Sequence, residues 1–311
     1  MNVKFKKQLK LYGYKNVFDE LIKIYKNGKF PNKILFSGMS GTGKSTFAYH
    51  LTNYFLSFDE EEKYDISENK INENNKSYKL TFDNCHPNFF KIDLKEDKKN
   101  IEISQIREMI NFINKTSFDN KNRIILINKV ELLNANSANA LLKNIEEPND
   151  KVFFFLIHNN EKKIIQTLKS RCIEFKLRLN KENIKTIVNS FFDEDIYKFM
   201  SKDFVNYFNS PSIYINFITF CKKNDLNFKE ITIEEFIKYL ISFNIYKKDN
   251  FIKNNIKYYV ELFFMKKTKE ISNNEIFNLI SYFNKKFNLF VKYNLDLESY
   301  FLEFRSKLLN E

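Results

Sequence analysis

The feature that most constrains this chain is the octapeptide Gly38–Ser45, GMSGTGKS, which fits the pattern G-x-x-x-x-G-K-[ST]. The apolar run Lys33–Ser37 precedes it, and the helical pattern Thr46–Leu56 follows it. A strand, a glycine-rich turn and a helix in this order are typical of a phosphate-binding loop, because successive backbone N–H groups point at phosphate oxygens. Since three of the 5 glycines of the chain lie here, a turn without a ligand is a poor explanation.

The residue types of this P-loop predict how a nucleotide would be held. Lys44 would reach the β- and γ-phosphates, and the Ser45 hydroxyl would ligate Mg²⁺. The other contacts are expected at Gly38, Gly41, Thr42, Gly43 and Thr46. The loop alone does not choose among kinases, GTPases, transporters and motor ATPases.

Apolar runs alternate with helical patterns up to about residue 178, which predicts a parallel sheet between layers of helices. The expected strands are Lys33–Ser37, Phe89–Asp93, Arg123–Asn128, Val152–His158 and Cys172–Leu177. The expected helices between them are Thr46–Leu56, Ser104–Asn114 and Ser137–Ile145. The polar stretch Asp59–Asn84 predicts a mobile loop or insertion. After Leu179 the strand signal fades, and amphipathic helices are expected, among them Ile233–Phe243, Asn254–Phe264 and Asn274–Phe287.

Composition narrows the setting of the chain. No apolar run of the 311 residues reaches membrane length, and the N-terminus has no apolar export signal. The odd number of scattered cysteines, 3, predicts free thiols in a reducing cytoplasm. The net charge of +12 suits a polyanionic partner such as nucleic acid, but Lys and Asn are abundant throughout, so charge alone does not establish DNA contact.

Several motifs lie in an order that resembles one family. The stretch Arg123–Pro148 reads RIILINKVELLNANSANALLKNIEEP, and Ser170-Arg171-Cys172 follows it. With His86-Pro87-Asn88 and Ser104-Gln105-Ile106-Arg107, these resemble the clamp-loader subunits of bacterial DNA polymerase III, a branch of the AAA+ ATPases. Leu11-Tyr12-Gly13 resembles the segment that flanks the adenine, which adds Leu11 and Tyr12 to the nucleotide contacts.

The resemblance implies an architecture for the whole chain. An AAA+ P-loop domain with a parallel five-stranded sheet would occupy residues 1–178. A helical lid would follow over residues 179–222, and an all-helical collar, the oligomerisation domain, over residues 223–311. Near the end, Tyr293-Asn294-Leu295-Asp296 resembles the closing segment of the family.

The chain departs from the family where hydrolysis is concerned. The third strand of the family ends in Asp-Glu, but Asn128 and Lys129 stand here, and neither supplies the charge for Mg²⁺ or a general base. Glu131 lies two residues further on, and we expect this offset to point it away from the site; the alternative is that Glu131 substitutes for the missing base. His158 or Asn159 occupies the sensor-1 place, and Ser210–Ile213 has no arginine where the family has its sensor-2 arginine.

Arg171 is the candidate catalytic residue. In the resembling family, this arginine reaches across a subunit interface to the γ-phosphate of a neighbour, as an arginine finger in trans. Only five of the 51 basic residues are arginines, so a retained arginine suggests a need for its planar fork. The alternative is a local ion pair with a carboxylate such as Glu174.

Zinc is not expected. Related loader subunits carry a four-cysteine module before the second strand, whereas Ser57–Cys85 contains Cys85 alone. Cys85 and His86 do not complete a tetrahedral site. We therefore predict no bound metal.

Taken together, these features most resemble the delta-prime type of loader subunit. The implied function is to help load the sliding clamp onto primed DNA, without own ATP hydrolysis but with weak binding of ATP or ADP. The implied partners are the other subunits of a hetero-pentameric ring, the sliding clamp and primer-template DNA in the cytoplasm, with no membrane. An ATP-hydrolysing gamma/tau-type subunit, a small loader subunit of the archaeal or eukaryotic kind, and an unrelated P-loop NTPase remain as alternatives.

Overall fold

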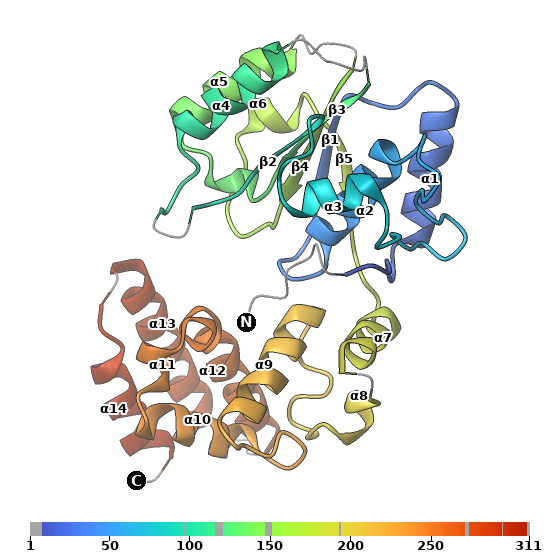
Figure 1. Cartoon of the computed structure of the whole chain (residues 1–311). Coiled ribbons are helices and arrows are strands. Elements are labelled where there is room, and N and C mark those ends of the chain that lie inside the picture. Colours follow the sequence, from blue (N-terminus) through green and yellow to red (C-terminus); the bar gives the residue numbers. More distant parts are fainter. Residues whose placement is uncertain are drawn as a thin grey trace. The chain divides into compact units, whose positions relative to one another are not determined.

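The computed structural model describes residues 8–95, 98–115, 121–146, 151–192, 194–270, 274–293 and 295–309 (Figure 1). The described residues form two compact units, which we treat one after the other. The first comprises the residues up to Phe191 together with Asn209–Ile213. The second comprises Phe192–Phe208 and the residues from Tyr214 onward. The division at residues 178 and 222 stays a prediction.

The first unit is built on a parallel five-stranded sheet with the strand order β2-β3-β4-β1-β5. The strands are β1 (Lys33–Ser37), β2 (Phe89–Ile92), β3 (Arg123–Ile127), β4 (Val152–His158) and β5 (Ile173–Lys176). The expected parallel sheet is confirmed. Every residue of β3 and β4 is buried, which explains why these strands read as unbroken apolar runs instead of alternating ones. β1 lies between β4 and β5. The loop that follows β1 leaves the sheet at its carboxyl edge, which is where α/β proteins bind ligands.

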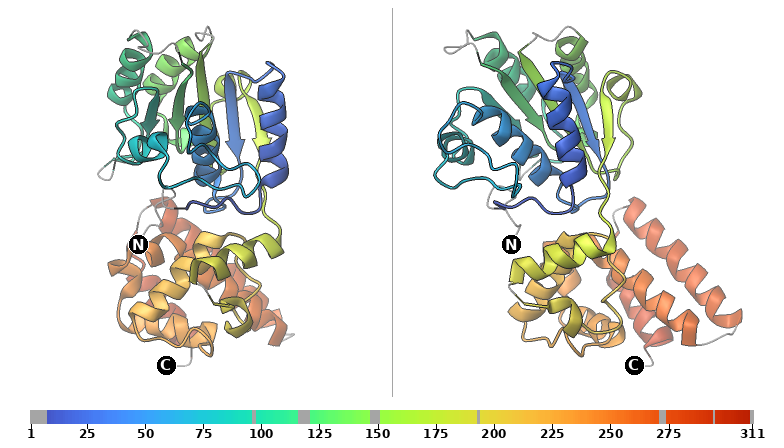
Figure 2. Two further views of the ribbon diagram at one scale, coloured as in Figure 1. Left: turned by 45° about the vertical axis from the view of Figure 1, so that its right-hand side comes forward. Right: turned by 90° about the vertical axis from the view of Figure 1, so that its right-hand side faces the viewer.

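Helices cover both faces of the sheet (Figures 1 and 2). On one face, α1 (Lys15–Lys26) and α2 (Lys44–Leu56) enclose a core rich in aromatic rings. Phe18 and Phe47 meet edge to face there, with their ring centroids 5.9 Å apart. After β5, α7 (Lys181–Phe192) follows.

The other face of the sheet has a core in which aliphatic side chains predominate. It is covered by α4 (Ile103–Asn114), α5 (Ala135–Glu146) and the short α6 (Gln166–Lys169), while the 3-10 helix η2 (Val130–Leu132) follows β3. The expected helices are confirmed, with α2 and α5 each beginning two residues earlier than expected.

The expectation of a loop over Asp59–Asn84 is wrong, while its being an insertion stays a prediction. This segment contains α3 (Lys76–Phe82), whose first turn is capped by the Asn75 side chain. Asn75 is buried and also accepts a hydrogen bond from Asn53 of α2, at 3.1 Å. Tyr64 and Ile71 are buried in the aromatic core, so a few apolar side chains fix a segment that is otherwise polar.

The second unit is all-helical in its described residues. Its helices are α8 (Ile196–Phe199), α9 (Pro211–Lys223), α10 (Ile233–Ser242), α11 (Ile245–Lys248), α12 (Asn250–Glu270), α13 (Asn274–Tyr293) and α14 (Glu298–Leu308), of which the first residues of α9 belong to the first unit. A capping box formed by Thr232 and Glu235 starts α10. The expected helix Asn254–Phe264 is longer at both ends, because Asp249 accepts backbone hydrogen bonds from Phe251 and Ile252 and starts α12 early.

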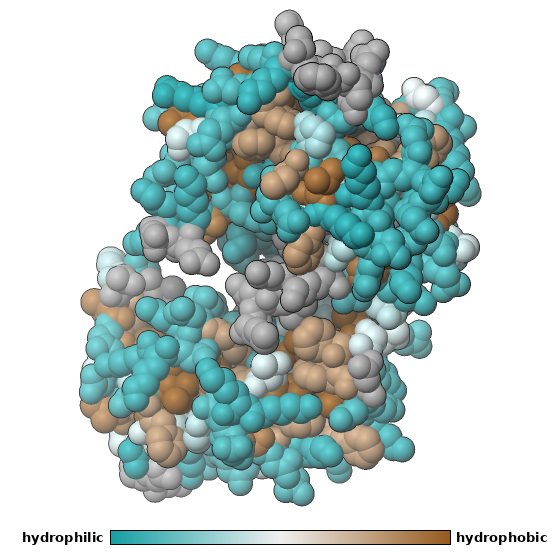
Figure 3. Space-filling view, in the orientation of Figure 1, coloured by the Kyte–Doolittle hydropathy of each residue, from teal (hydrophilic) through white to brown (hydrophobic). Residues whose placement is uncertain are grey.

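The second unit leaves large apolar side chains in contact with solvent, and Figure 3 shows brown patches among hydrophilic residues on the viewed face of this unit. The most exposed are Phe243, Phe277, Leu289, Tyr293, Leu295 and Leu302, each more than half exposed. Among the described residues, no helix combines the length and the apolar character that crossing a bilayer requires.

Candidate phosphate-binding site and the arginine before β5

The P-loop joins β1 to α2, as its sequence predicts. Its close packing requires glycine at two positions. A side chain at Gly38 would overlap the carbonyl oxygen of Leu177, and one at Gly41 would overlap the Ser212 hydroxyl. Gly41 also has a φ of +75°, which side-chain-bearing residues rarely adopt. The loop therefore presents its backbone N–H groups at the start of α2, the arrangement that suits a phosphate.

Lys44 is the first residue of α2, and its side chain is buried, with an exposure of 3%. Its ammonium donates a hydrogen bond to the carbonyl oxygen of Met39 within the loop. Burial lowers the pKa of Lys44 to about 8, and the negative charges of Glu131 and Glu161 partly oppose that change. The lysine is therefore held ready beside the loop, where a phosphate would meet it.

Tyr14 supports the loop from the N-terminal side, and sequence analysis missed it. Its hydroxyl donates to the Thr42 carbonyl oxygen at 2.8 Å, and burial raises its pKa to about 12. Leu11 is buried in the aromatic core, and its N–H donates to the Asn69 carbonyl oxygen, whereas Tyr12 is half-buried. The signal for this contact in the sequence was that a second tyrosine, Tyr14, stands two positions after Tyr12.

Ser45, Asn128 and Asp93 form a hydrogen-bonded row beside the loop. The Ser45 hydroxyl donates to the Asn128 side-chain oxygen at 3.3 Å, and the Asn128 amide donates to Asp93 at 2.9 Å. Asn128 thus connects the Ser45 hydroxyl to a carboxylate at the end of β2. The loop residues fit a nucleotide phosphate, but an amide at this position fits Mg²⁺ poorly, because hard cations prefer carboxylates.

Glu131 does not lie where sequence analysis expected it. Lys129 adopts a left-handed conformation, with a φ of +55°, and turns the chain into η2. Glu131 is consequently buried, with an exposure of 8%, and accepts a hydrogen bond from the Asn159 N–H at 3.3 Å. The peptide that links His158 and Asn159 accepts the Gly38 N–H on one side and donates to Glu131 on the other, so the expectation that the offset points Glu131 away from the site is wrong.

The two sensor positions also come close to the loop. His158 ends β4 and Asn159 follows it; both are buried, and the His158 Nε2 lies 2.9 Å from the Lys162 carbonyl oxygen. The Ser212 N–H donates to the Gly41 carbonyl oxygen at 3.3 Å. Ser210 is fully buried, and its hydroxyl has no hydrogen-bond partner in the described part of the chain. Small serines therefore pack against the P-loop where the family has its sensor-2 arginine.

Arg171 lies outside this cluster, at the end of α6. Its side chain is 37% exposed, and its guanidinium pairs with Glu146 of α5 at 2.8 Å and donates to the Thr167 carbonyl oxygen at 3.0 Å. Glu174, the expected partner of a local ion pair, is engaged by the Ser37 hydroxyl and by Lys169 instead. Nothing in the sequence pattern marked Glu146 as the partner.

The residues considered for zinc are apart. Cys85 is exposed, Cys172 is half-buried and Cys221 is buried, while His86 contacts Ser77 and the Asn88 backbone. Within the described ranges, no group of three or more His, Cys, Asp or Glu side chains could hold a metal. The prediction of no zinc remains one for metal analysis to decide.

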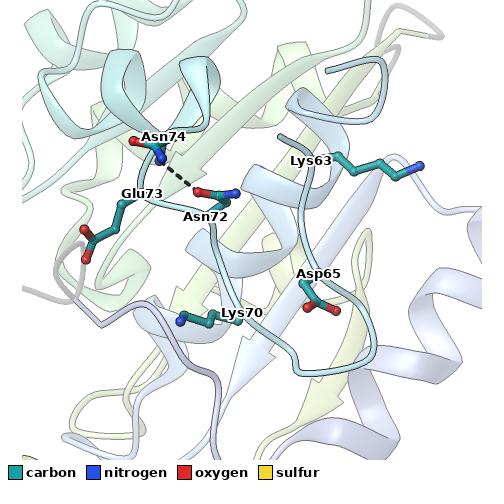
Figure 4. Close-up of a pocket in the computed structure, with 6 residues that line it drawn as sticks. All are labelled: Lys63, Asp65, Lys70, Asn72, Glu73 and Asn74. Atoms are coloured by element: carbon teal, nitrogen blue, oxygen red, sulfur yellow. Dashed lines mark hydrogen bonds between the residues drawn. The ribbon is translucent and has the colours of Figure 1, made fainter. Parts of the chain in front are cut away.

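A separate polar hollow of about 390 Å³ lies over the segment that precedes α3 (Figure 4). It is lined by Lys63, Asp65, Lys70, Asn72, Glu73 and Asn74. The Asn72 side chain accepts a hydrogen bond from the Asn74 N–H at 2.9 Å, which closes a turn. With no glycine-rich backbone in it, this hollow lacks the features of the P-loop site.

A glycine-rich loop between β1 and α2, at the carboxyl edge of a parallel sheet, defines a P-loop protein of the α/β class. The family model described as "DNA polymerase III, delta subunit" matches residues 13–181, more than half of the chain. The chain therefore belongs to this DNA polymerase III family, and the resemblance to bacterial clamp-loader subunits, most of all to the delta-prime type, is confirmed.

Three curated relatives illustrate the similarity. A DNA polymerase III subunit delta' of Pseudomonas aeruginosa is 32% identical over 99 residues, which cover 32% of this chain and 30% of the relative. The subunit delta' of Buchnera aphidicola subsp. Schizaphis graminum is 29% identical over 56% of this chain and 51% of the relative. A subunit gamma of the same organism is 32% identical over 46% of this chain and 41% of the relative. The chain thus matches about half or less of these relatives' lengths.

Among solved structures, a gamma subunit-related protein of Thermotoga maritima aligns with a TM-score of 0.40 and 15% identity, over 86% of this chain and 77% of that one. The Thermotoga maritima RuvB Holliday junction branch migration motor aligns with a TM-score of 0.43 and 17% identity, over 76% of this chain and 72% of that one.

Proposed function

We propose that this chain acts as a delta-prime-type subunit of a clamp loader, which helps to load a sliding clamp onto primed DNA. Its contribution is to give Arg171 to the nucleotide site of a neighbouring ATPase subunit. The proposal is carried by the combination of a residue that is present and a pair of residues that is missing. An exposed guanidinium stands before β5, and the acidic pair for hydrolysis is missing beside the chain's own P-loop.

The surroundings of Arg171 suit a group that serves another molecule. An exposed ion pair such as Arg171–Glu146 contributes only about 0–1 kcal/mol, so the guanidinium can leave it at little cost. A γ-phosphate in a dry interface offers a stronger, bidentate partner. Glu146 thereby keeps Arg171 ordered until a neighbour is present.

The chain's own P-loop is proposed to bind ATP or ADP weakly and not to hydrolyse it. The backbone of Gly38–Gly43 and Lys44 would hold the phosphates, and Leu11, Tyr12 and Thr46 would complete the site. Ser45 gives its hydrogen bond to Asn128, an amide, and Lys129 cannot act as a base. Binding without turnover follows.

The proposed partners are the other subunits of a hetero-pentameric ring, the sliding clamp and primer-template DNA. The exposed apolar side chains of α13 and α14, such as Phe277, Leu289 and Leu302, would pack against sister collars. The net charge of +12 favours contact with DNA.

A gamma-type ATPase is the second candidate, because a gamma subunit is among the relatives. It would need a carboxylate pair where Asn128 and Lys129 stand. For this reason we propose the delta-prime role over the gamma role.

The test is reconstitution of the full chain with the loader subunits of its own organism. Arg171→Ala is expected to lower DNA-stimulated ATPase and clamp loading of the complex by about tenfold, less than the 10³–10⁵ of a single finger because the other sites keep theirs. Arg171→Lys should restore little, since an ammonium lacks the planar fork. The melting temperature of the isolated chain should stay nearly unchanged.

Arg178→Ala is the matched control, because Arg178 is also exposed and its substitution removes the same charge near β5. An Arg171→Ala complex with ATPase and clamp loading equal to the Arg178→Ala complex would refute the finger role. Failure of the wild-type chain to enter any loader complex would refute the delta-prime role as a whole.

A further inference from the structure

Glu131 carries a buried carboxylate that the chemistry above does not use. One of its oxygens accepts the Asn159 N–H, and the other is buried without a hydrogen-bond partner among the described residues. A buried carboxylate without a full set of partners is costly unless an opposite charge lies close to it. The buried Glu131 carboxylate therefore needs a cation close to it.

Backbone hydrogen bonds place this carboxylate beside the P-loop. The His158 carbonyl oxygen accepts the N–H of Gly38 at 3.2 Å, and the N–H of the next residue, Asn159, goes to Glu131. One peptide unit thus separates the carboxylate from the first loop residue, where the ends of β3, β4 and β1 meet. The Lys44 side chain passes beside Gly38: its Cδ lies 3.6 Å from the position that a Cβ on residue 38 would occupy.

Within the described residues, the Lys44 ammonium likewise lacks a charged hydrogen-bond partner. It is buried and, in the part of the chain that the structure describes, has one hydrogen-bond partner, the neutral carbonyl of Met39. The two carboxylates that act on it are Glu131, the stronger, and Glu161. Glu161 is exposed, so solvent screens its charge, whereas Glu131, like Lys44, is buried.

We propose that Glu131 is the internal counter-ion of Lys44 in the nucleotide-free P-loop, and that it sets how weakly the chain binds nucleoside triphosphates. The second half of this statement rests on the proposed nucleotide binding. An incoming phosphate must share Lys44 with a carboxylate that is already in place. Because Lys44 reaches the γ- as well as the β-phosphate, the triphosphate loses more than the diphosphate.

The pairing itself is tested without nucleotide, by a double-mutant cycle in the full chain. Glu131→Gln keeps the side-chain oxygen that accepts the Asn159 N–H but removes the charge. It should lower the midpoint of urea unfolding in the wild-type background and have a markedly smaller effect in a Lys44→Met background. Equal shifts in both backgrounds would overturn the counter-ion.

Calorimetry with a non-hydrolysable ATP analogue and with ADP tests the effect on binding. Glu131→Gln should bind the analogue about tenfold more tightly than wild type and gain less for ADP, while Glu161→Gln changes neither. Unchanged affinity, weaker binding only when Mg²⁺ is present, or loss of a measurable ATPase in Glu131→Gln would each overturn the proposal, the last two by making Glu131 a metal ligand or a base. If no variant binds nucleotide although Lys44 and Glu131 are coupled, the proposed nucleotide binding and the affinity-setting role fail, and the counter-ion stands.

Discussion

Lys44 and Arg171 are the two cations on which the proposed function depends, and their surroundings are opposite. Lys44 is buried, with an exposure of 3%, next to a neutral carbonyl and a buried carboxylate. The Arg171 side chain is 37% exposed in an ion pair with an exposed partner, Glu146. The difference teaches that the chain builds the group for its own ligand into the core, where the buried charge itself costs stability. It leaves the group for a neighbour on the surface, where an exposed charge does not.

The largest effect that sharpens this comparison is expected from Gly38→Ala. The new methyl group would meet the Leu177 carbonyl oxygen, so the backbone of the loop or of β5's end must move, at a cost of about 2–4 kcal/mol. Gly28→Ala is the control, since nothing lies within 4 Å of that position and only its left-handed φ of +68° is strained. Urea unfolding measures both. Equal losses would mean that the loop is not part of the packed core.

The next effect is a pH dependence that Lys44 causes. Its pKa is about 8 in the folded chain and near 10.5 when exposed, so between these values the unfolded chain binds more protons and stability rises with pH. The buried charge of Lys44 thus costs about 3 kcal/mol below pH 8, and this cost is progressively removed above it. Glu131 and Glu161 are the charged groups that act on it.

Lys44→Met removes this titration and serves as the reference. The stability advantage of Lys44→Met over wild type should shrink as the pH is raised from about 7 to about 9.5, when both are unfolded in urea at each pH. A constant difference across this range would show that the Lys44 ammonium is not desolvated, and the contrast with Arg171 would weaken.

A smaller effect is expected from Asn128→Asp, which restores one acid of the missing pair. In the present structure the Asn128 amide donates to Asp93 at 2.9 Å, so the substitution sets two carboxylates side by side and should cost about 1–2 kcal/mol. Mg²⁺ would relieve this repulsion. Melting curves with and without Mg²⁺ should show a rise for Asn128→Asp that wild type lacks; matching Mg²⁺ responses would contradict the position assigned to Asn128.

The smallest effect is expected at Glu146, the partner of Arg171. Because both side chains are exposed, Glu146→Gln should change the free energy of unfolding by less than about 0.5 kcal/mol. The complex ATPase should stay within about twofold of wild type, since the guanidinium is left free to reach a phosphate. A loss as large as that of Arg171→Ala would show that Glu146 positions Arg171 in the active complex and does more than hold it in the free chain.

Much of the fold could be predicted because its signals are local. The fully buried strands β3 and β4 appear as unbroken apolar runs, and the P-loop has its pattern within eight consecutive residues. The segment Asp59–Asn84 could not be predicted, since its composition is polar throughout. A few side chains, Tyr64, Ile71 and Asn75, order it through contacts with α1 and α2 that no local pattern records.

By itself, the sequence determined that this chain has a P-loop between a strand and a helix, that Asn128 and Lys129 stand where a hydrolytic acid pair is expected, and that an arginine precedes the last strand. Only the tertiary structure decided how the charges pair. Glu131 is turned inward by the left-handed Lys129, Ser212 packs on Gly41, and Arg171 pairs with Glu146 instead of Glu174. The physical reason is that these partners come from elements that are far apart along the chain. Their contacts depend on how sheet and helices pack, and residue spacing does not encode them.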